Sequence, residues 1–386
     1  MKRYLILVLS IVLALSVLFK PNEVNAEEKS QEEIVNEILE GVNEEDFNFL
    51  LEFLSSFTNK NLTFKELVLS FLTGDFSSVD ISFNSFKNSI INSFNKFGGR
   101  VIIYLLIIGI LFNLANIISL KNTDNTLKNA INYISISIAL ILLFKVVEII
   151  FSYTTSKLEF LSKTVEIAFP TMFSISGLIG NFGVSVLKPF TAFLSFLISV
   201  LSVKLFLPLL YFETSVSAIS NLSDTVKLSG LKKTTSAIYK WLLLLILGVY
   251  SLSIGSQSLV NAQYNGISVK ILKYLTNSTV PIVGGFLSGG MEVLISSAVL
   301  IKNSIGLLSI VAVILNIGAS AIEILIFSFM VKFFTSVCES VLDEKYYKTL
   351  TSVTDVFNGL AGLLLISGFV FIITVLFVIS ATAFIF

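Results

Sequence analysis

The chain contains no histidine and a single cysteine, Cys338. Without histidine, a Ser-His-Asp triad and histidine-ligated metal sites are excluded. One cysteine excludes an internal disulfide and any multi-cysteine zinc or iron–sulfur site. Gly284 and Gly289 have the spacing of a phosphate-binding P-loop, but Gly290 stands where that motif requires lysine. We therefore expect no enzymatic activity and no cofactor, and ATP-driven work would need a separate subunit.

Charged residues are also scarce in the chain. Only 13% of the 386 residues are charged and the formal net charge is zero, whereas 54% are hydrophobic. Soluble domains carry about a quarter charged residues. Lysines are scattered, so no basic patch indicates a nucleic-acid partner. Several apolar runs of about 20 residues are long enough to cross a lipid bilayer. The composition predicts an all-α polytopic membrane protein.

The N-terminus resembles a secretory signal peptide over residues 1–26, with Lys2 and Arg3 ahead of an apolar core and a cleavage site after Ala26. The alternative is an uncleaved anchor. In residues 27–96, apolar residues recur at helical spacing among polar residues, as in amphipathic helices. This pattern predicts a small extracytoplasmic domain. Within it, Thr63 and Glu66 form a capping-box pattern at a helix start. The apolar stripes favour core packing over a partner surface.

Residues 97–164 predict two membrane helices, about 101–120 and 130–152. The second contains Lys145 and Glu148, which at i and i+3 can pair on one helix face. Charges in hydrocarbon are costly, so such residues usually pair or face a polar interior. Two interpretations stay open: a polar contact lining a path, or a pair near a helix end whose heads reach the lipid headgroups.

The rest of the chain predicts one arrangement repeated, over 165–257 and 275–386. Each copy opens at a proline, continues through glycines and a long apolar run, and ends in a polar linker and a second apolar run. Pro170 and Pro281 are 111 residues apart, and Gly248 and Gly368 are 120 apart. Such repeats in membrane proteins indicate two similar bundles. The alternative is chance similarity of low-complexity apolar sequence.

Proline and glycine break the start of each copy into pieces too short to span as straight helices. Two re-entrant hairpins are the prediction, with full crossing as the alternative. With both hairpins re-entrant, the inner linkers hold nine lysines and the outer loops four, as the positive-inside rule favours. This gives about six spans with both termini outside. The candidate hairpin residues are Pro170, Gly177, Gly180, Gly183, Pro281, Gly284, Gly285, Gly289 and Gly290.

Two further charges, Lys204 and Glu323, lie deep in predicted spans at comparable places in the two copies. Paired with each other, they would be neutralised out of water. The alternative is that each finds water or backbone separately. Together with Lys145 and Glu148 they are the candidate polar or pore residues.

The layout resembles the stage III sporulation protein AE family of endospore-forming bacteria, and the resemblance covers almost the whole chain. The residues that carry it most specifically are Thr279-Val280-Pro281-Ile282-Val283-Gly284-Gly285-Phe286-Leu287-Ser288 and Val299-Leu300-Ile301-Lys302-Asn303-Ser304-Ile305-Gly306. The resemblance implies a place in the mother-cell membrane around the forespore. It also implies partners: ring-forming proteins similar to secretion-system components and a secretion-type ATPase. It carries no catalytic residues.

Three functions stay open at this point. The first is a structural or channel subunit of the apparatus that links mother cell and forespore, with residues 27–96 facing the intermembrane space. The second is a stand-alone permease or secondary transporter for a small solute, because twin repeats with broken hairpins suit a transporter. The third is a membrane platform that recruits the rings through residues 27–96 and conducts nothing.

Overall fold

A computed structural model describes residues 44–58, 63–73, 87–88, 91, 98–121, 125–178, 187–222, 228–264, 283–337 and 344–380. Within these ranges the regular secondary structure is helical, which confirms the predicted all-α class. The predicted signal peptide and the cleavage site after Ala26 lie outside the described residues, so both stay predictions.

The N-terminal part of the described chain forms three short helices, η1 (Glu44–Phe47), α3 (Asn48–Thr58) and α4 (Phe64–Thr73). The capping box at the start of α4 is confirmed. The Thr63 amide donates to Glu66 Oε2 at 3.0 Å, and the Glu66 amide donates to Thr63 Oγ1 at 3.2 Å. The hydrogen bond from the Thr63 backbone amide, followed by that from the Thr63 side chain, lowers the pKa of the Glu66 carboxyl from its ordinary value.

Helices α3 and α4 pack against the long helices. Both contact α12 (Val283–Val313), and the Phe53 ring lies 5.0 Å from the ring of Phe160 in α7 (Asn125–Leu178). The Phe47 and Phe64 rings stack at 4.6 Å and both are buried. The apolar side chains of α3 and α4 thus serve packing, as predicted, whereas the other predicted stripes lie outside the described residues. A separate domain over 27–96 stays a prediction.

The remaining helices are long. They are α6 (Gly99–Lys121), α7, α8 (Leu187–Leu201), α9 (Leu207–Leu222), α10 (Ser229–Tyr264), α12, α13 (Ala319–Val337) and α14 (Glu344–Ser380). One π-helical turn, η3 (Ser202–Phe206), joins α8 to α9, and another, η4 (Ile314–Gly318), joins α12 to α13. Five described stretches are long and apolar enough to cross a membrane: Thr126–Ser176, Pro189–Asn221, Ser229–Gly255, Ser297–Ser336 and Tyr347–Ile379.

The predicted break at Pro170 is wrong. Helix α7 runs without interruption from Asn125 to Leu178 with Pro170 inside it, and the predicted loop 153–164 is helical. Proline removes one backbone donor, which a helix survives when its neighbours hold it. Here the Phe169 ring lies 5.7 Å from the ring of Phe371 in α14, and Met172 is fully buried. Packing on both sides of Pro170 offsets the free-energy cost of the missing backbone hydrogen bond.

The second predicted hairpin is also helical where it is described. Helix α12 begins at Val283 and passes through Gly284, Gly285, Gly289 and Gly290 to Val313. Glycine costs about 1 kcal/mol per position relative to alanine in a helix interior, so glycines weaken a helix without ending it. Gly177 lies in α7. Gly180, Gly183 and Pro281 fall outside the described residues.

The two predicted copies have the same order of elements: a helix, a π-helical turn, a helix and a final long helix. The π turns begin at Ser202 and Ile314, so they are 314 − 202 = 112 residues apart, close to the sequence offsets. A common origin of the two halves stays a prediction, and this order of elements agrees with it.

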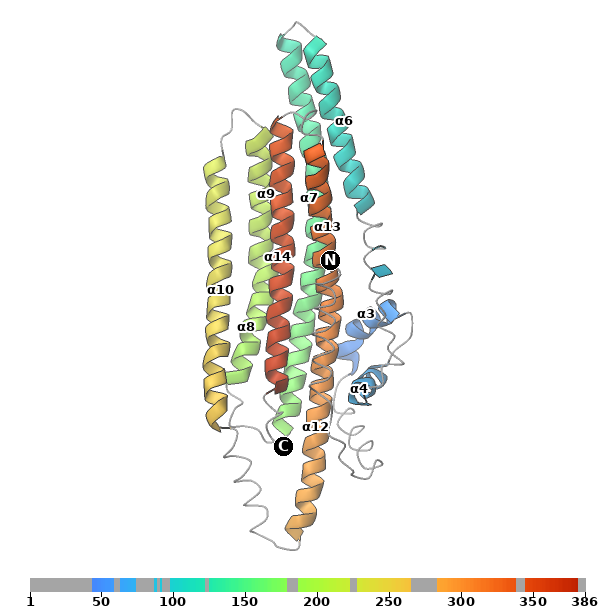
Figure 1. The fold of residues 1–386 in the computed structure, drawn as a ribbon, viewed down its shortest axis with the longest axis vertical. Coiled ribbons are helices and arrows are strands. Elements are labelled where there is room, and N and C mark those ends of the chain that lie inside the picture. Colours follow the sequence, from blue (N-terminus) through green and yellow to red (C-terminus); the bar gives the residue numbers. More distant parts are fainter. Residues whose placement is uncertain are drawn as a thin grey trace. The chain divides into compact units, whose positions relative to one another are not determined.

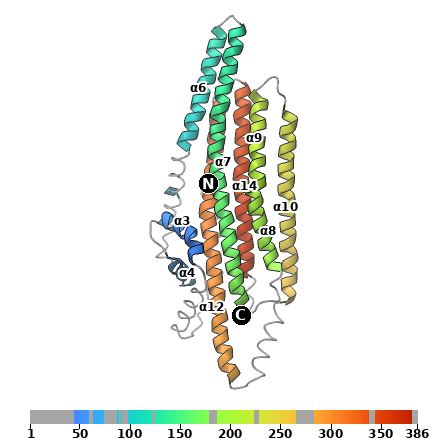
Figure 2. The same cartoon turned by 180° about the vertical axis from the view of Figure 1, so that it is seen from behind.

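Helix α14 lies at the centre of the bundle, in contact with α7, α8, α9, α12 and α13 (Figures 1 and 2). Helix α10 lies at the edge of the bundle and packs against α8 and α9 (Figure 1). The long helices alternate in direction. The C-terminal end of α9 and the N-terminal end of α10 lie at the same end of the bundle as the C-terminal end of α13 and the N-terminal end of α14 (Figure 1). The lysine-rich linkers therefore begin and end on one side, as predicted, whereas the orientation in a membrane stays a prediction.

Candidate functional site

Polar side chains meet inside the apolar bundle where α7 packs against η4 and α13. Tyr153 Oη lies 2.5 Å from Glu323 Oε2 and 2.9 Å from Ser320 Oγ. The Ser320 hydroxyl donates to the Asn316 carbonyl at 2.6 Å. Glu323 is only 2% exposed. A buried carboxyl needs hydrogen bonds or a counter-charge, and here a tyrosine hydroxyl supplies the first.

Two groups extend this cluster, which we define as Tyr153, Lys157, Asn316, Ser320 and Glu323. The Lys157 ammonium lies 5.2 Å from the centroid of the Tyr153 ring, within electrostatic range of Glu323. The Asn316 side-chain oxygen is buried and has no hydrogen-bond partner. Asn316 belongs to the π turn η4, and such turns often occur at functional sites.

A second interior charge, Lys302, lies within α12. Lys302 is fully buried, and its ammonium donates to the Val378 carbonyl at 3.0 Å. Val378 lies in the last described turn of α14. Carbonyls near a helix C-terminus and the helix dipole stabilise a cation. Lys302 therefore ties this turn of α14 to α12.

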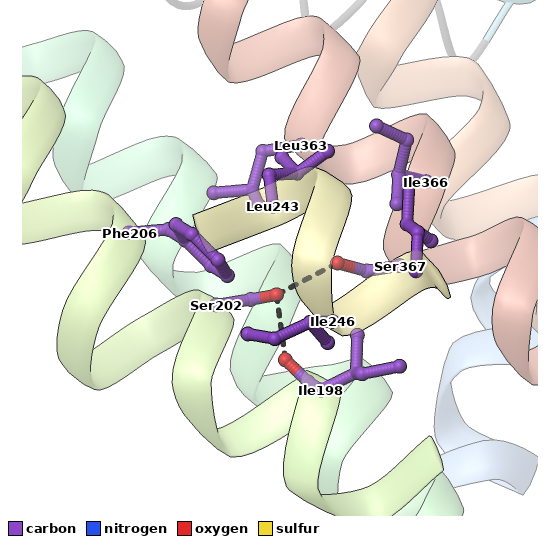
Figure 3. Close-up of a pocket in the computed structure, with 9 residues that line it drawn as sticks. Ile198, Ser202, Phe206, Leu243, Ile246, Leu363, Ile366 and Ser367 are labelled. Carbon is purple, nitrogen blue, oxygen red and sulfur yellow. Dashed lines mark hydrogen bonds between the residues drawn. The ribbon is translucent and has the colours of Figure 1, made fainter. Parts of the chain in front are cut away.

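A third set of polar contacts lies between α8, α10 and α14. Ser202 Oγ and Ser367 Oγ are 2.8 Å apart, and the Ser202 hydroxyl also contacts the Ile198 carbonyl (Figure 3). The Tyr250 hydroxyl donates to the Val370 carbonyl at 2.9 Å. These bonds join α10 and the π turn η3 to α14.

Figure 3 also shows the pocket beside these serines. It has a volume of about 10 Å³, close to what a single water molecule requires. Apart from the two serines its lining is apolar. The pocket is too small for a solute and is interpreted as imperfect packing beside the serine pair. Its lining residues are Ile198, Ser202, Phe206, Leu243, Ile246, Leu247, Leu363, Ile366 and Ser367.

The four charged residues singled out from the sequence, Lys145, Glu148, Lys204 and Glu323, do not form one cluster in the structure. Lys145 Nζ and Glu148 Oε2 pair at 2.8 Å, but their side chains are 58% and 62% exposed to the surroundings of the chain. The predicted pairing is confirmed. Neither side chain faces the bundle interior, so the interpretation as a path lining receives no support from this geometry.

The predicted Lys204–Glu323 pair is not formed. Lys204 lies in η3, which contacts α7, α8, α9 and α14, whereas Glu323 contacts Tyr153 from α7. Helix α14 lies between the two halves and packs against both α9 and α13. The Glu323 carboxyl is therefore hydrogen-bonded to Tyr153 on the neighbouring helix α7 and not paired with the distant Lys204.

Sequence reasoning missed Tyr153, Lys157 and Asn316, and it named Lys302 only as part of the block that resembles the family. Tyr153 and Lys157 are four residues apart, which places them on one helix face. Their partners lie about 165 residues downstream, and only the packing of α7 on α13 brings them together. The available signal was the persistence of polar residues at helical spacing, Asn316, Ser320 and Glu323, in an otherwise apolar run.

Among the described residues, no three His, Cys, Asp or Glu side chains come close enough to hold a metal ion. The interior groups found here are hydroxyls, one amide, one carboxyl and two ammonium groups. They can exchange and hold protons and orient dipoles.

Comparison with known proteins gives two matches. The family model described as stage III sporulation protein AE matches residues 62–382, most of the chain. A protein of Bacillus subtilis (strain 168) named stage III sporulation protein AE is 25% identical over 126 residues. That alignment covers 33% of this chain and 32% of the relative, so the chain is aligned with about a third of the curated relative's length. No solved structure matches the chain.

Proposed function

The chain belongs to the stage III sporulation protein AE family, and from this premise we propose that it is an integral membrane component of the apparatus that connects mother cell and forespore during sporulation. The match over residues 62–382 carries the proposal. A sporulation role follows from the family. The channel-like apparatus, the mother-cell membrane and the ring-forming and ATPase partners belong to the proposal.

The chemistry of the bundle supports a structural role within an assembly. Five described stretches can cross a membrane, which suits a multi-pass component. The interior polar groups of α7, α12, α13 and α14 bond to one another across helices, and such bonds hold a bundle together. The pocket of Figure 3 holds about one water molecule, so it offers a stand-alone permease no solute site. The family match indicates a sporulation role, and the permease function is not favoured on that ground.

The test is deletion in the native spore-former, followed by imaging of engulfed forespores and a late forespore reporter. We expect forespores to collapse and the reporter to stay silent. Restoring the wild-type chain from a second locus should recover both, which separates loss of this protein from effects on neighbouring genes. Normal spores in the deletion strain would refute the proposed role.

A second test asks whether the protein acts together with partner proteins. The tagged chain, solubilised from sporulating cells, should co-purify with ring-forming membrane proteins and a secretion-type ATPase. Vesicles holding the purified chain alone should not accumulate solutes. Solute uptake by those vesicles would overturn the assembly role and restore the permease.

A further inference from the structure

The outer face of α7 is polar along much of its length. Between Glu148 and Ser176, a stretch that the structure describes throughout, Pro170 is the only exposed residue that is not polar. The last large hydrophobic side chain exposed on α7 before this stretch is Ile141. Six of the exposed residues recur at helical spacing on one face. We call them the α7 stripe: Glu148, Ser152, Ser156, Glu159, Lys163 and Glu166.

The α7 stripe is nearly as long as the hydrocarbon core of a bilayer is thick. A helix rises 1.5 Å per residue, so the stretch from Glu148 to Glu166 covers about 27 Å, against about 30 Å for the core. Lys145, paired with Glu148, extends the polar surface by one turn. All of these residues lie within Thr126–Ser176, which is long and apolar enough to cross a membrane. The polar face thus runs through the apolar layer and does not stop at its surface.

Contacts between helices show which residues lie level with the α7 stripe. The Phe151 ring of α7 lies 5.2 Å from the Tyr211 ring of α9, and Ser202 Oγ of η3 lies 2.8 Å from Ser367 Oγ of α14. Helices α8 and α9 run opposite to α7, whereas α14 runs in the same direction as α7 (Figure 1). Ser202 precedes Tyr211 by nine residues. Ser202 and Ser367 therefore lie level with about residue 160 of α7, inside the stripe.

At this level the outer faces of other helices are apolar. Leu365 of α14, two residues before Ser367, is 47% exposed. Leu244 of α10 is 67% exposed and follows Leu243, which lines the pocket beside Ser202 and Ser367. Exposed leucines suit contact with lipid, whereas charged side chains are costly in hydrocarbon. At one depth the bundle thus presents apolar faces that suit lipid and, on α7, a polar face that does not.

Lys204 adds a charge at the same depth. It lies two residues after Ser202 in η3, which contacts α7, and its side chain is exposed. The contacts within the described part of the chain give Lys204 neither a hydrogen bond nor an ion pair. An unpaired ammonium in this layer needs water or a counter-charge. Its position in a helix turn next to α7 therefore agrees with a polar environment on this side of the bundle.

The composition of the α7 stripe distinguishes water from a protein partner as its surroundings. The cores of protein interfaces are enriched in aromatic side chains and depleted in charged ones. The stripe consists of three glutamates, one lysine and two serines, with no apolar side chain. Glu159 lies near its middle, where a side chain as short as glutamate does not reach the lipid headgroups. Neither lipid nor an ordinary protein interface suits this face, and water does.

We propose that the α7 stripe faces water inside the membrane and forms one wall of an aqueous path for ions and small hydrophilic solutes. Lys145 and Glu148, which do not face the interior of their own bundle, belong to this outer wall. The contact of the stripe with water follows from membrane insertion alone. The neighbouring subunits that close the path around it rest on the proposed function.

The test measures how fast single cysteines react with a membrane-impermeant maleimide. The native cysteine is first removed as Cys338→Ser, and the amount of chain in the membrane checks that it still inserts. Ser156→Cys then reports on the α7 stripe, and Ser152→Cys repeats the measurement one turn away. Leu365→Cys and Leu244→Cys are the matched controls, on exposed apolar faces at the same level. The reagent is added to open membrane fragments from sporulating cells, so that it reaches both membrane surfaces.

The thiolate is the form that reacts, and it forms readily in water and poorly in apolar surroundings. We expect both stripe cysteines to be labelled at least about tenfold faster than the two controls, and all four equally once the chain is denatured. Stripe cysteines as slow as the controls would show that lipid or protein covers the stripe, which overturns the proposal. Equally fast labelling of all four in the membrane would place this level outside the bilayer and overturn it too.

The outcome is separable from that of the proposed function. Fast labelling of Ser156→Cys together with normal spores in the deletion strain would leave the aqueous stripe standing and refute only the sporulation role. Slow labelling together with collapsed forespores would refute the aqueous stripe and leave the sporulation role intact.

Discussion

Gly306 lies where α12 crosses α14 and α7, and it leaves no room for a side chain. A methyl group there would lie 2.8 Å from Ile379 Cδ1 and 3.0 Å from both Met172 Cε and Val375 Cγ1. The first two atoms are tips of flexible chains and can yield, whereas valine is stiff at χ1. Overpacking of this kind costs about 1–3 kcal/mol. Gly306→Ala is therefore expected to destabilise the bundle.

The same substitution also gains helix propensity, about 1 kcal/mol relative to glycine. Gly248→Ala in α10 is the matched control, because nothing lies within 4 Å of a methyl group at that position. Both glycines lie within helices, so the propensity gain cancels when the variants are compared. The difference between the variants should be about 1–3 kcal/mol, with Gly306→Ala the less stable.

The assay is unfolding of the purified chain in detergent, followed by helical circular dichroism and by the fluorescence of the single tryptophan, Trp241. We expect Gly306→Ala to unfold at a lower temperature than wild type and Gly248→Ala at the same or a higher one. Equal stability of the two variants would show that α12 and α14 do not cross as closely as described, and would refute the reasoning.

Three further predictions follow from named contacts. Lys302→Met keeps the chain length but removes the bond to the Val378 carbonyl, so unfolding should need about 1.5–3 kcal/mol less, measured in the same assay. Tyr250→Phe removes the hydroxyl that contacts both the Val370 carbonyl and the Thr374 hydroxyl and should cost about 1 kcal/mol; no change in stability would refute these contacts. The lowered pKa of Glu66 means that its contribution to α4 is present above the ordinary carboxyl pKa of 4.5 and is lost as pH falls through the folded value. Hydrogen exchange of α4 amides should therefore rise on acidification, and Glu66→Gln, which does not titrate, should remove that dependence.

The sequence predicted local features correctly where interactions between residues a few positions apart determine them. The Thr63–Glu66 capping box and the Lys145–Glu148 pair depend on spacings of three residues along one helix, and both are present. The break at Pro170 was wrong for a different reason. Proline does cost the helix a backbone hydrogen bond. The prediction considered that cost alone and left out the tertiary contacts of α7, such as that with Phe371, which keep the helix continuous.

The interior polar contacts could not be predicted at all. Glu323 was singled out because a charge in an apolar run is costly, which is a property of the sequence. Its partner was assigned to Lys204, the other deep charge, because pairing of opposite charges is the simplest way to lower that cost. The actual partner, Tyr153, is an ordinary amphipathic residue that carries no such signal.

By itself the sequence determined the class of the protein: apolar runs of membrane length force backbone hydrogen bonds to close within helices, since hydrocarbon offers none. It also determined the family, through the block from Thr279 to Gly306. Only the tertiary structure decided which side chains meet. Tyr153 reaches Glu323, and Lys302 reaches Val378, because α7, α12, α13 and α14 pack in one order around a common core. That order depends on summed contacts between helices far apart in the chain, and no spacing along the sequence encodes it.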